Sequence, residues 1–419
     1  MHETRHDRLP RRVIAGRRDP GRHRHRRSGR RRARQGEPAP DLGRGARGRH
    51  VRHLLARRGR RQSWKGAAGV ADVETRRPVR PDLVHRVGSI TKTFTAVAVL
   101  QQAGKGTIDL DAPVARYLPG LIQDGRGERI TVRMLLNHTS HISDYDHLIF
   151  QRVEDLDANQ FRTWRPEELV SLALAAPATG QPGALPGEYS NTNYLIAGLL
   201  LEKVTGVKAE RYITDHVIRK AGLRHTSFPR TPHIPGPHSK AYEGLSGLID
   251  PPKDYSVYDM SWAGTAGAIT STMEDLSRFY RLLLRGELLD ARLLAEMQKT
   301  VPLRAGDGVA AYGLGLVPAD LPCGRFWGHE GGVIGMTTVS VTSADGNRQV
   351  SIGFNLTGYQ RVDEGGNPVP HPIDAAVVAH FQAATCGTVD ATVDATADAT
   401  ADAAPPFPRL LLDRIPIKG

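Results

Sequence analysis

The chain has few cysteines and no long apolar run, and these two features exclude several classes of protein. Its 419 residues contain only two cysteines, Cys323 and Cys386. Two cysteines are too few for a disulfide-based scaffold, and their spacing does not fit a zinc site. Two alternatives remain open: a single disulfide between them, or two unrelated free thiols. The longest apolar run, near 195–201, falls far short of the ~18 residues of a membrane span. Stable insertion into a membrane is therefore not expected.

Lysine is absent from the first 61 residues, which differ in composition from the rest. Residues 1–61 hold 22 Arg and 5 acidic residues, and their sparse apolar residues show no period that could build a core. They also lack the apolar stretch of a signal peptide. A basic arm for anionic partners is one interpretation, although no aromatic residue is present for base stacking. We favour a disordered or spurious N-terminal segment, because arginine without lysine is typical of a GC-rich gene read from a wrong start or frame.

Most of the net charge of +13 comes from that segment. Residues 62–419 hold 35 basic and 39 acidic residues, and such a mildly acidic body argues against a nucleic-acid partner. The body reads as strands near both ends with helices between them, including a closing helix at 373–384 and a hairpin turn at Asp345-Gly346. This order favours an α+β fold with a sheet built from both ends and a helical insertion. Residues 388–419 begin with an Asp/Ala/Thr/Val repeat and read as a low-complexity linker and tail.

The first candidate site lies where a polar turn leads into an apolar helix, at residues 86–100. Ser89 falls at the helix start, and Lys92 falls one turn later on the same face. A buried lysine that loses its proton could accept the serine proton and make it a nucleophile. A serine at a helix start is more often a cap, so this segment alone does not decide between the two roles.

Two later segments add candidate residues. Tyr189 and Asn191 lie two apart before an apolar helix, where a tyrosine can move protons and an asparagine can hold a substrate carbonyl. Residues 328–335 are glycine-rich, and glycines on a strand allow close approach of another group. Gly332 N–H could serve a developing oxyanion together with Ser89 N–H, and His329 could supply a donor. Each segment alone is more often structural: a buried tyrosine with a capping asparagine, and a glycine-rich turn.

The three motifs in this order, Ser-x-x-Lys, Tyr-Ser-Asn and His-Glu-Gly, resemble those of the penicillin-recognising serine hydrolases. This family includes serine-type D-alanyl-D-alanine carboxypeptidases, class C β-lactamases and related esterases. The similarity is greatest to the secreted actinomycete D-Ala-D-Ala carboxypeptidase type, and it covers about residues 62–387. It also includes Asp109-Leu110-Asp111, Ser261-Trp262-Ala263 and residues 312–316.

The resemblance implies a β-lactamase/transpeptidase-like α+β fold, in which an antiparallel sheet flanked by helices (about 62–88 and 305–387) adjoins an all-helical subdomain (about 105–300). It implies an acyl-serine mechanism without metal or cofactor, in a protein that is secreted, monomeric and bridged between Cys323 and Cys386. Its substrates would be small peptides, esters or β-lactams. The residues it assigns are Ser89, Lys92 and Tyr189 for catalysis, with either Lys92 or Tyr189 as the base, and Asn191, Trp262, His329, Gly331 and Gly332 for substrate binding.

Several positions depart from the family pattern. Glu330 and Gly332 replace hydroxyl residues that would grip a substrate carboxylate, and 316–320 lacks the expected arginine. We therefore expect a carboxypeptidase-like hydrolase with weak or altered peptidase activity and better turnover of neutral esters or amides, unless Arg325 compensates. An esterase, a class C-like β-lactamase and a non-catalytic binding protein are the alternatives. His141 stands where relatives have glycine, and the sheet is expected to lack an edge strand because 1–61 offers no replacement.

Overall fold

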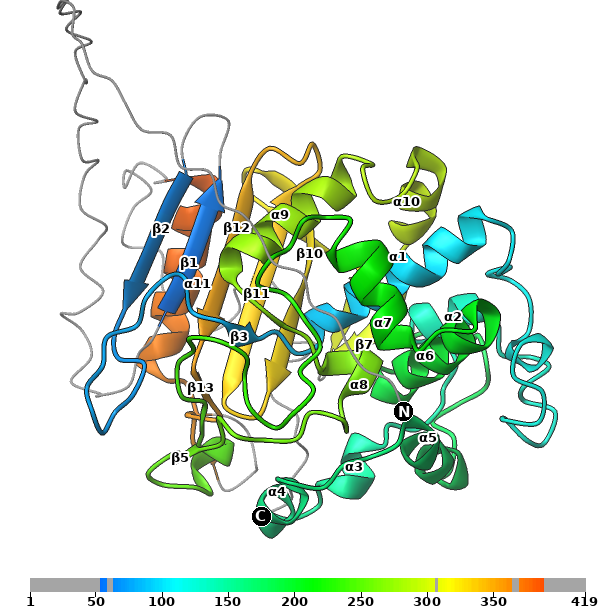
Figure 1. The fold of residues 1–419 in the computed structure, drawn as a ribbon, viewed down its shortest axis with the longest axis horizontal. Helices are drawn as coiled ribbons and strands as arrows, with labels where there is room; N and C mark the ends of the chain where they lie inside the picture. The colour runs from blue at the N-terminus through cyan, green and yellow to red at the C-terminus, as the bar shows by residue number, and fades with distance from the viewer. Residues whose placement is uncertain (1–52, 59–62, 306–307, 364–368, 388–419) are drawn as a thin grey trace, which may run out of the picture. The chain divides into compact units, whose positions relative to one another are not determined.

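The central sheet has six antiparallel strands in the order β2-β1-β12-β11-β10-β9 (Figure 1). The computed structural model describes residues 53–58, 63–305, 308–363 and 369–387. The expectations about 1–52 and 388–419 lie outside the described residues. The sheet is built from both ends of the described chain, as the sequence predicts; its strands are β1 His53–Arg58, β2 Ser63–Ala68, β9 Val317–Leu321, β10 Gly324–Val333, β11 Met336–Ser343 and β12 Gln349–Phe354.

Strand β1 corrects the expectation that the sheet lacks an edge strand. It lies inside the segment 1–61, pairs with β12 from Leu54↔Gly353 to Arg58↔Gln349, and pairs with β2 on its other side. The arginine-rich composition around it concealed a strand of six residues. The edge of the sheet is therefore complete, and its end strand is β2 rather than β12.

Two helices cover opposite faces of this sheet. Along β12 the side chains alternate, so Val350 and Ile352 face one cluster while Ser351 faces the other side. The closing helix α11 (Pro372–Cys386) packs Phe381 into the Val350 cluster. Helix α9 (Met273–Leu284) lies on the other face, where Ser277 hydrogen-bonds to Ser351. Helix α11 begins where the sequence predicts the closing helix, and the Thr272 side chain caps α9.

Helix α1 (Ile90–Gly104) is buried at every residue from Ile90 to Leu100, as its apolar sequence predicts. It packs against α6, α8 and β10, and so joins the sheet to the helices that lie between the sheet strands in sequence. The other helices are α2 Val132–Leu136, α3 Asp146–Ile149, α4 Glu154–Asn159, α5 Pro166–Ala175, α6 Asn191–Thr205, α7 Ala209–Ile213, α8 Gly264–Gly267 and α10 Ala291–Met297, with shorter turns at Val114–Arg116, Thr214–Ile218 and Leu245–Gly247.

Three small sheets complete the fold. Strand β3 (His85–Arg86) pairs with β6 (Thr270–Ser271) directly before Ser89. The other two sheets join β13 (Leu356–Thr357), β4 (Tyr242–Glu243) and β5 (Lys253–Asp254), and pair β7 (Val301–Ala305) with β8 (Gly308–Tyr312). None of the helices in the described ranges is long and apolar enough to cross a membrane.

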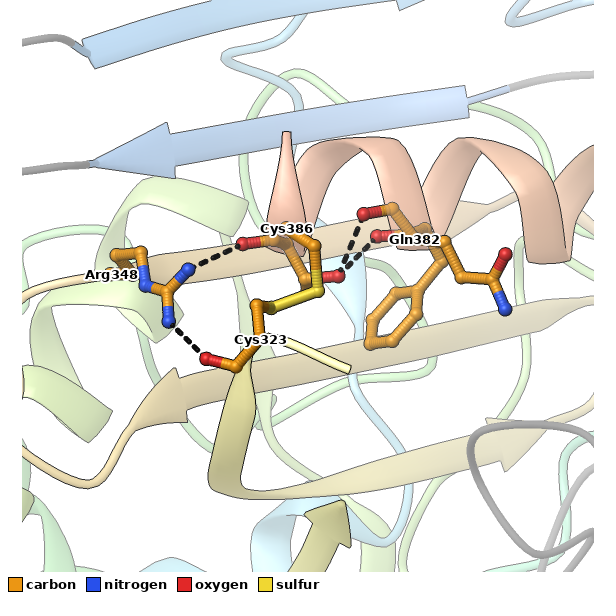
Figure 2. Close-up of a disulfide and its surroundings, with 6 residues drawn as sticks. Cys323, Arg348, Gln382 and Cys386 are labelled. Carbon is orange, nitrogen blue, oxygen red and sulfur yellow. Dashed lines mark hydrogen bonds between the residues drawn. A yellow bond between two sulfur atoms is a disulfide. The ribbon is translucent and has the colours of Figure 1, made fainter. Parts of the chain in front are cut away.

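A disulfide joins Cys323 to Cys386 and ties the β9–β10 turn to the end of α11 (Figure 2). The bond links residues 63 apart in sequence, as the resemblance predicts. Arg348 lies beside it and donates to Cys323 O at 2.8 Å and to Thr385 O at 3.4 Å. The guanidinium of Arg348, which belongs to a third segment, therefore contacts both of the segments that the disulfide joins.

Candidate active site

Ser89 lies in a tight turn between β3 and α1, pressed against the backbone of β10. Gly88 has a φ of +50°, which favours glycine, and a side chain there would come within 2.9 Å of Gly332 N. A side chain on Gly331 would lie 2.8 Å from Ser89 N. The two glycine segments thus bring the backbone of Gly332 beside the Ser89 amide, which is the placement that an oxyanion site built from these two N–H groups requires.

The side chain of Ser89 does not cap α1, so the structural alternative for this serine is wrong. It lies instead 3.0 Å from Lys92 Nζ, and both residues are buried. Lys92 also contacts Asn191 Oδ1 and, at 3.0 Å, Ala266 O. Burial lowers the pKa of Lys92 to about 7, against a smaller opposing effect of Asp144 and Asp146. A large fraction of Lys92 is therefore neutral near neutral pH and able to accept the serine proton.

Tyr189 completes the convergence that the sequence predicts. Its ring centroid is 4.8 Å from Lys92 Nζ, and its ring packs 4.2 Å from that of His138. Burial, aided by Tyr312, raises the pKa of Tyr189 well above its ordinary value, and the nearby Ser89 hydroxyl offsets part of the rise. The phenol is thus neutral over the working pH range and can donate a proton rather than accept one in its resting form.

Asn191 is used differently from what the sequence predicts. Its carbonyl oxygen accepts from Lys92, while its Nδ2 donates to Asp144 Oδ2 at 3.0 Å and to Asp146 Oδ2 at 2.8 Å. These contacts occupy both ends of the amide that we expected to hold the substrate. Asn191 therefore connects the lysine beside the nucleophile to two carboxyl groups, the half-buried Asp144 and the buried Asp146.

A cavity opens over Ser89, and most of the predicted side chains lie on its wall. Trp262 is buried there, with its ring edge-on to that of Phe150 at a centroid distance of 4.9 Å. The main-chain carbonyl of Trp262 accepts a hydrogen bond from Tyr145 Oη at 2.6 Å. The other lining residues are Ser89, Asp144, Tyr145, Asp146, His147, Glu188, Tyr189, Asn191, Ala263, Ala266, Gly267, Arg304, Ala305, Gly332 and Val333.

The third predicted segment contributes its backbone rather than its side chains. His329 is fully buried, contacts Tyr312 Oη at 2.9 Å and Glu330 O through its ring, and does not line the cavity. Burial lowers the pKa of His329 to about 3, so this ring stays neutral. Glu330, which replaces a hydroxyl residue expected to grip a substrate carboxylate, does not line the cleft, and Arg325 does not compensate for the missing arginine. Glu330 is buried away from the cavity wall, and Arg325 pairs with Asp320 at 2.6 Å on the surface.

Sequence reasoning missed the acidic residues of the cavity. Asp144 and Asp146 follow the His138-Thr139-Ser140 segment at a spacing that leaves both on one side of a turn, and this Asp-x-Asp pattern was the available signal. Burial raises the pKa of Asp144, and burial together with Asp144 raises that of Asp146 further. In the same loop, His141 has a φ of +54°, as its replacement of a glycine predicts, and its ring contacts Ala184 O at 3.0 Å.

No cluster of metal-ligating side chains occurs in the part of the chain that the structure describes. The arrangement offers nucleophilic chemistry: a serine hydroxyl in contact with a lysine of lowered pKa, a neutral phenol nearby, and the backbone of Gly332 close to that of Ser89.

Comparison with known proteins agrees with this geometry. A protein-family model described as Beta-lactamase matches residues 43–368. Penicillin-binding protein 4* of Bacillus subtilis (strain 168) is 26% identical over 306 residues, which cover 70% of this chain and 65% of that protein. The chain therefore spans less than two thirds of the length of this relative.

Two solved structures share the fold. The D-stereospecific amidohydrolase from Streptomyces sp. is 36% identical, with a TM-score of 0.70, over 81% of this chain and 95% of that one. The D-amino acid amidase from Ochrobactrum anthropi SV3, complexed with L-phenylalanine amide, has a TM-score of 0.65 over 74% of this chain and 87% of that one; at 24% identity it supports the fold alone. The matched family model and the α+β architecture show that this chain belongs to the Beta-lactamase family of penicillin-recognising serine hydrolases.

Proposed function

We propose that this protein hydrolyses small amides of amino acids, with a preference for the D configuration, through an acyl-enzyme on Ser89. The observation that carries the proposal is the contact of Ser89 Oγ with Lys92 Nζ at 3.0 Å on the floor of a cavity that Tyr189 also lines. The D preference rests on the name of the Streptomyces relative, which the chain covers over 95% of its length.

In the proposed reaction, Ser89 Oγ attacks the amide carbonyl while its proton passes to neutral Lys92. The oxygen of the tetrahedral intermediate takes hydrogen bonds from the N–H groups of Ser89 and Gly332. Collapse breaks the C–N bond, and the leaving nitrogen takes a proton from the Lys92–Tyr189 side of the site. Water then attacks the ester, gives its proton back through the same groups and releases the acid with Ser89 restored.

Carboxypeptidase activity on D-Ala-D-Ala peptides is the second candidate, since the family includes such enzymes. A terminal carboxylate needs a cation that is not already paired. Among the described residues of the cavity wall, Arg304 is held by Glu188 at 2.9 Å, and the wall carries three carboxyl groups. This charge distribution supports amide substrates without a terminal carboxylate over peptides that end in one.

The test compares D-phenylalanine amide, L-phenylalanine amide, a D-Ala-D-Ala peptide and a p-nitrophenyl ester, with Ser89→Ala as the control. Faster release of ammonia from the D amide than of D-alanine from the peptide is expected, together with an acyl adduct on the Ser89 peptide in mass spectra. Faster cleavage of the D-Ala-D-Ala peptide would select the carboxypeptidase. Absence of any adduct with all four compounds and with a fluorescent penicillin would overturn the hydrolase function.

We also propose that the protein is exported and monomeric. The Cys323–Cys386 bond supports export, because such bonds persist in oxidising compartments. Peptide maps of the protein recovered outside the cell, with and without reductant, would contradict this if both thiols were free. Sedimentation of the purified protein tests the monomer.

A further inference from the structure

The two carboxyl groups of the cavity, Asp144 and Asp146, are placed where the mechanism above does not use them. They lie at the start of the short helix α3, and both line the cavity that contains Ser89. Asp146 is nine-tenths buried, and its Oδ1 is buried without a hydrogen-bond partner in the described part of the chain. A buried carboxylate oxygen without a donor is costly, so this oxygen marks a position where a donor is expected to bind.

The protein's own donors near this oxygen are already engaged. Asn191 Nδ2 gives its two hydrogens to Asp144 Oδ2 and Asp146 Oδ2. Lys92 Nζ contacts Ser89, Asn191 and Ala266, which accounts for three positions around an amine. Across the cavity, Arg304 is paired with Glu188. Asp146 therefore lines a cavity whose cations, Lys92 and Arg304, are held by other groups, and its Oδ1 has no donor among the described residues.

The charge balance favours an incoming cation. The groups that face the pair are Lys92, exposed His147, which acts on Asp144, and the neutral phenols Tyr145 and Tyr189. Burial disfavours two carboxylates side by side, so the pair binds a proton more readily than an exposed one would. A substrate cation can compensate the same charge and makes that proton unnecessary.

We propose that Asp144 and Asp146 form the subsite for a cationic ammonium group on the substrate. Binding of this cation disfavours the protonated form of the carboxyl pair, so a proton on the pair is displaced. This inference rests on the proposed function and names its substrate class: amides of amino acids whose α-amino group is free. The ammonium donates to Asp146 Oδ1 while the carbonyl carbon reaches Ser89, and the displaced proton leaves to solvent. Acylated amino groups have no charge to offer and leave the oxygen unpaired.

Binding to the full-length Ser89→Ala variant tests this without turnover. D-Phenylalanine amide and N-acetyl-D-phenylalanine amide are titrated calorimetrically at pH 6.5, where a free α-amino group is charged, in two buffers that differ in ionisation enthalpy. The free amide is expected to bind about tenfold to hundredfold more tightly, with release of protons to the buffer. Adding Asp146→Asn should abolish both the preference for the free amide and the proton release. Adding Asp82→Asn should change neither, because the side chain of Asp82 is 66% exposed at the surface.

Other outcomes separate this proposal from the proposed function. Equal binding of the two amides, or binding without proton release, would overturn the subsite. Failure of both amides to bind, while the p-nitrophenyl ester acylates Ser89 of the wild type, would also overturn it and leave the hydrolase standing. Preferential binding of the free amide without acylation of Ser89 by any substrate would overturn the hydrolase and support the subsite.

Discussion

Arg86 and Lys92 lie three residues on either side of Ser89 and are both buried, yet their side-chain partners differ. Within the described ranges, the Arg86 guanidinium donates to main-chain carbonyls, at Tyr255, Pro232, Ser256 and Tyr258, over 2.8–3.3 Å. Lys92 contacts a hydroxyl and an amide linked to two carboxyl groups. Burial lowers the pKa of Arg86 to about 10 but that of Lys92 to about 7. Burial lowers both pKa values, and an ammonium starts from a lower ordinary pKa than a guanidinium, 10.5 against 12.5, so of the two buried cations Lys92 is the one suited to proton transfer.

Replacing Lys92 should give the largest effect. It should lower the reaction rate and leave the stability of the fold unchanged. In Lys92→Met the serine loses its proton acceptor, and kcat/KM is expected to drop on the order of 10³-fold. The melting temperature should change little, because methionine fills the same space and removes a buried amine. Amide turnover and thermal unfolding measure the two effects. Lys105→Met, at the exposed end of the same helix, is the matched control; a similar loss of activity there would break the comparison.

Replacing Arg86 should do the opposite. Arg86→Met leaves several buried carbonyls of residues 232–258 without a donor, so the free energy of unfolding should fall by about 3 kcal/mol. Arg80→Met, which breaks a surface pair with Asp82, is expected to cost less than about 1 kcal/mol. Denaturant unfolding of both variants checks this. An Arg86 variant as stable as the wild type would show that the carbonyl contacts do not anchor the turn.

The dependence of rate on pH sharpens the same contrast. Only the neutral amine of Lys92 accepts the serine proton, and its pKa is about 7. The value of kcat/KM should therefore rise about tenfold per unit below pH 7 and level off above it. A pH–rate profile of p-nitrophenyl ester cleavage, followed by stopped flow, measures this. A midpoint unchanged in Asn191→Leu, which removes the amide contact, would argue that Asn191 does not influence Lys92.

The smallest effect should come from His85, beside Arg86 in β3. Burial lowers the pKa of His85 to about 4, while the unfolded chain has a value near 6.5. Between these values the unfolded state binds the extra proton, so stability should fall as pH drops from 6.5 to 4. Thermal unfolding across this range should give a shallower slope for His85→Gln, whose amide can still reach Thr337 O. An identical slope would assign the proton uptake to other buried histidines.

Local sequence patterns predicted the elements around the nucleophile better than they predicted long-range contacts. The apolar helix after Ser89 and the closing helix at 373–384 follow from local patterns, and the structure confirms them. The convergence of Tyr189 on Lys92, and the Cys323–Cys386 bond, came from the family resemblance and not from spacing. Strand β1 was missed because pairing with β12, rather than its own composition, defines it.

The roles of the polar cleft residues were hardest to predict. Whether Asn191 faces substrate or protein depends on Asp144 and Asp146, which lie over 40 residues away in sequence. In the same way, the side to which Glu330 points depends on strand register, since neighbouring residues of β10 face opposite sides of the sheet. Such choices are set by tertiary contacts that no single segment contains.

The glycines at 88 and 331 have a consequence for how this family member could acquire new specificities. Because any side chain at these two positions would collide with the facing backbone, both positions are closed to substitution. Variation in what the pocket accepts is then expected from lining residues outside the Ser89–Lys92–Asn191 contacts, such as His147, Trp262 and Val333. A mutant library confined to those positions would explore new substrates while leaving the reacting centre intact.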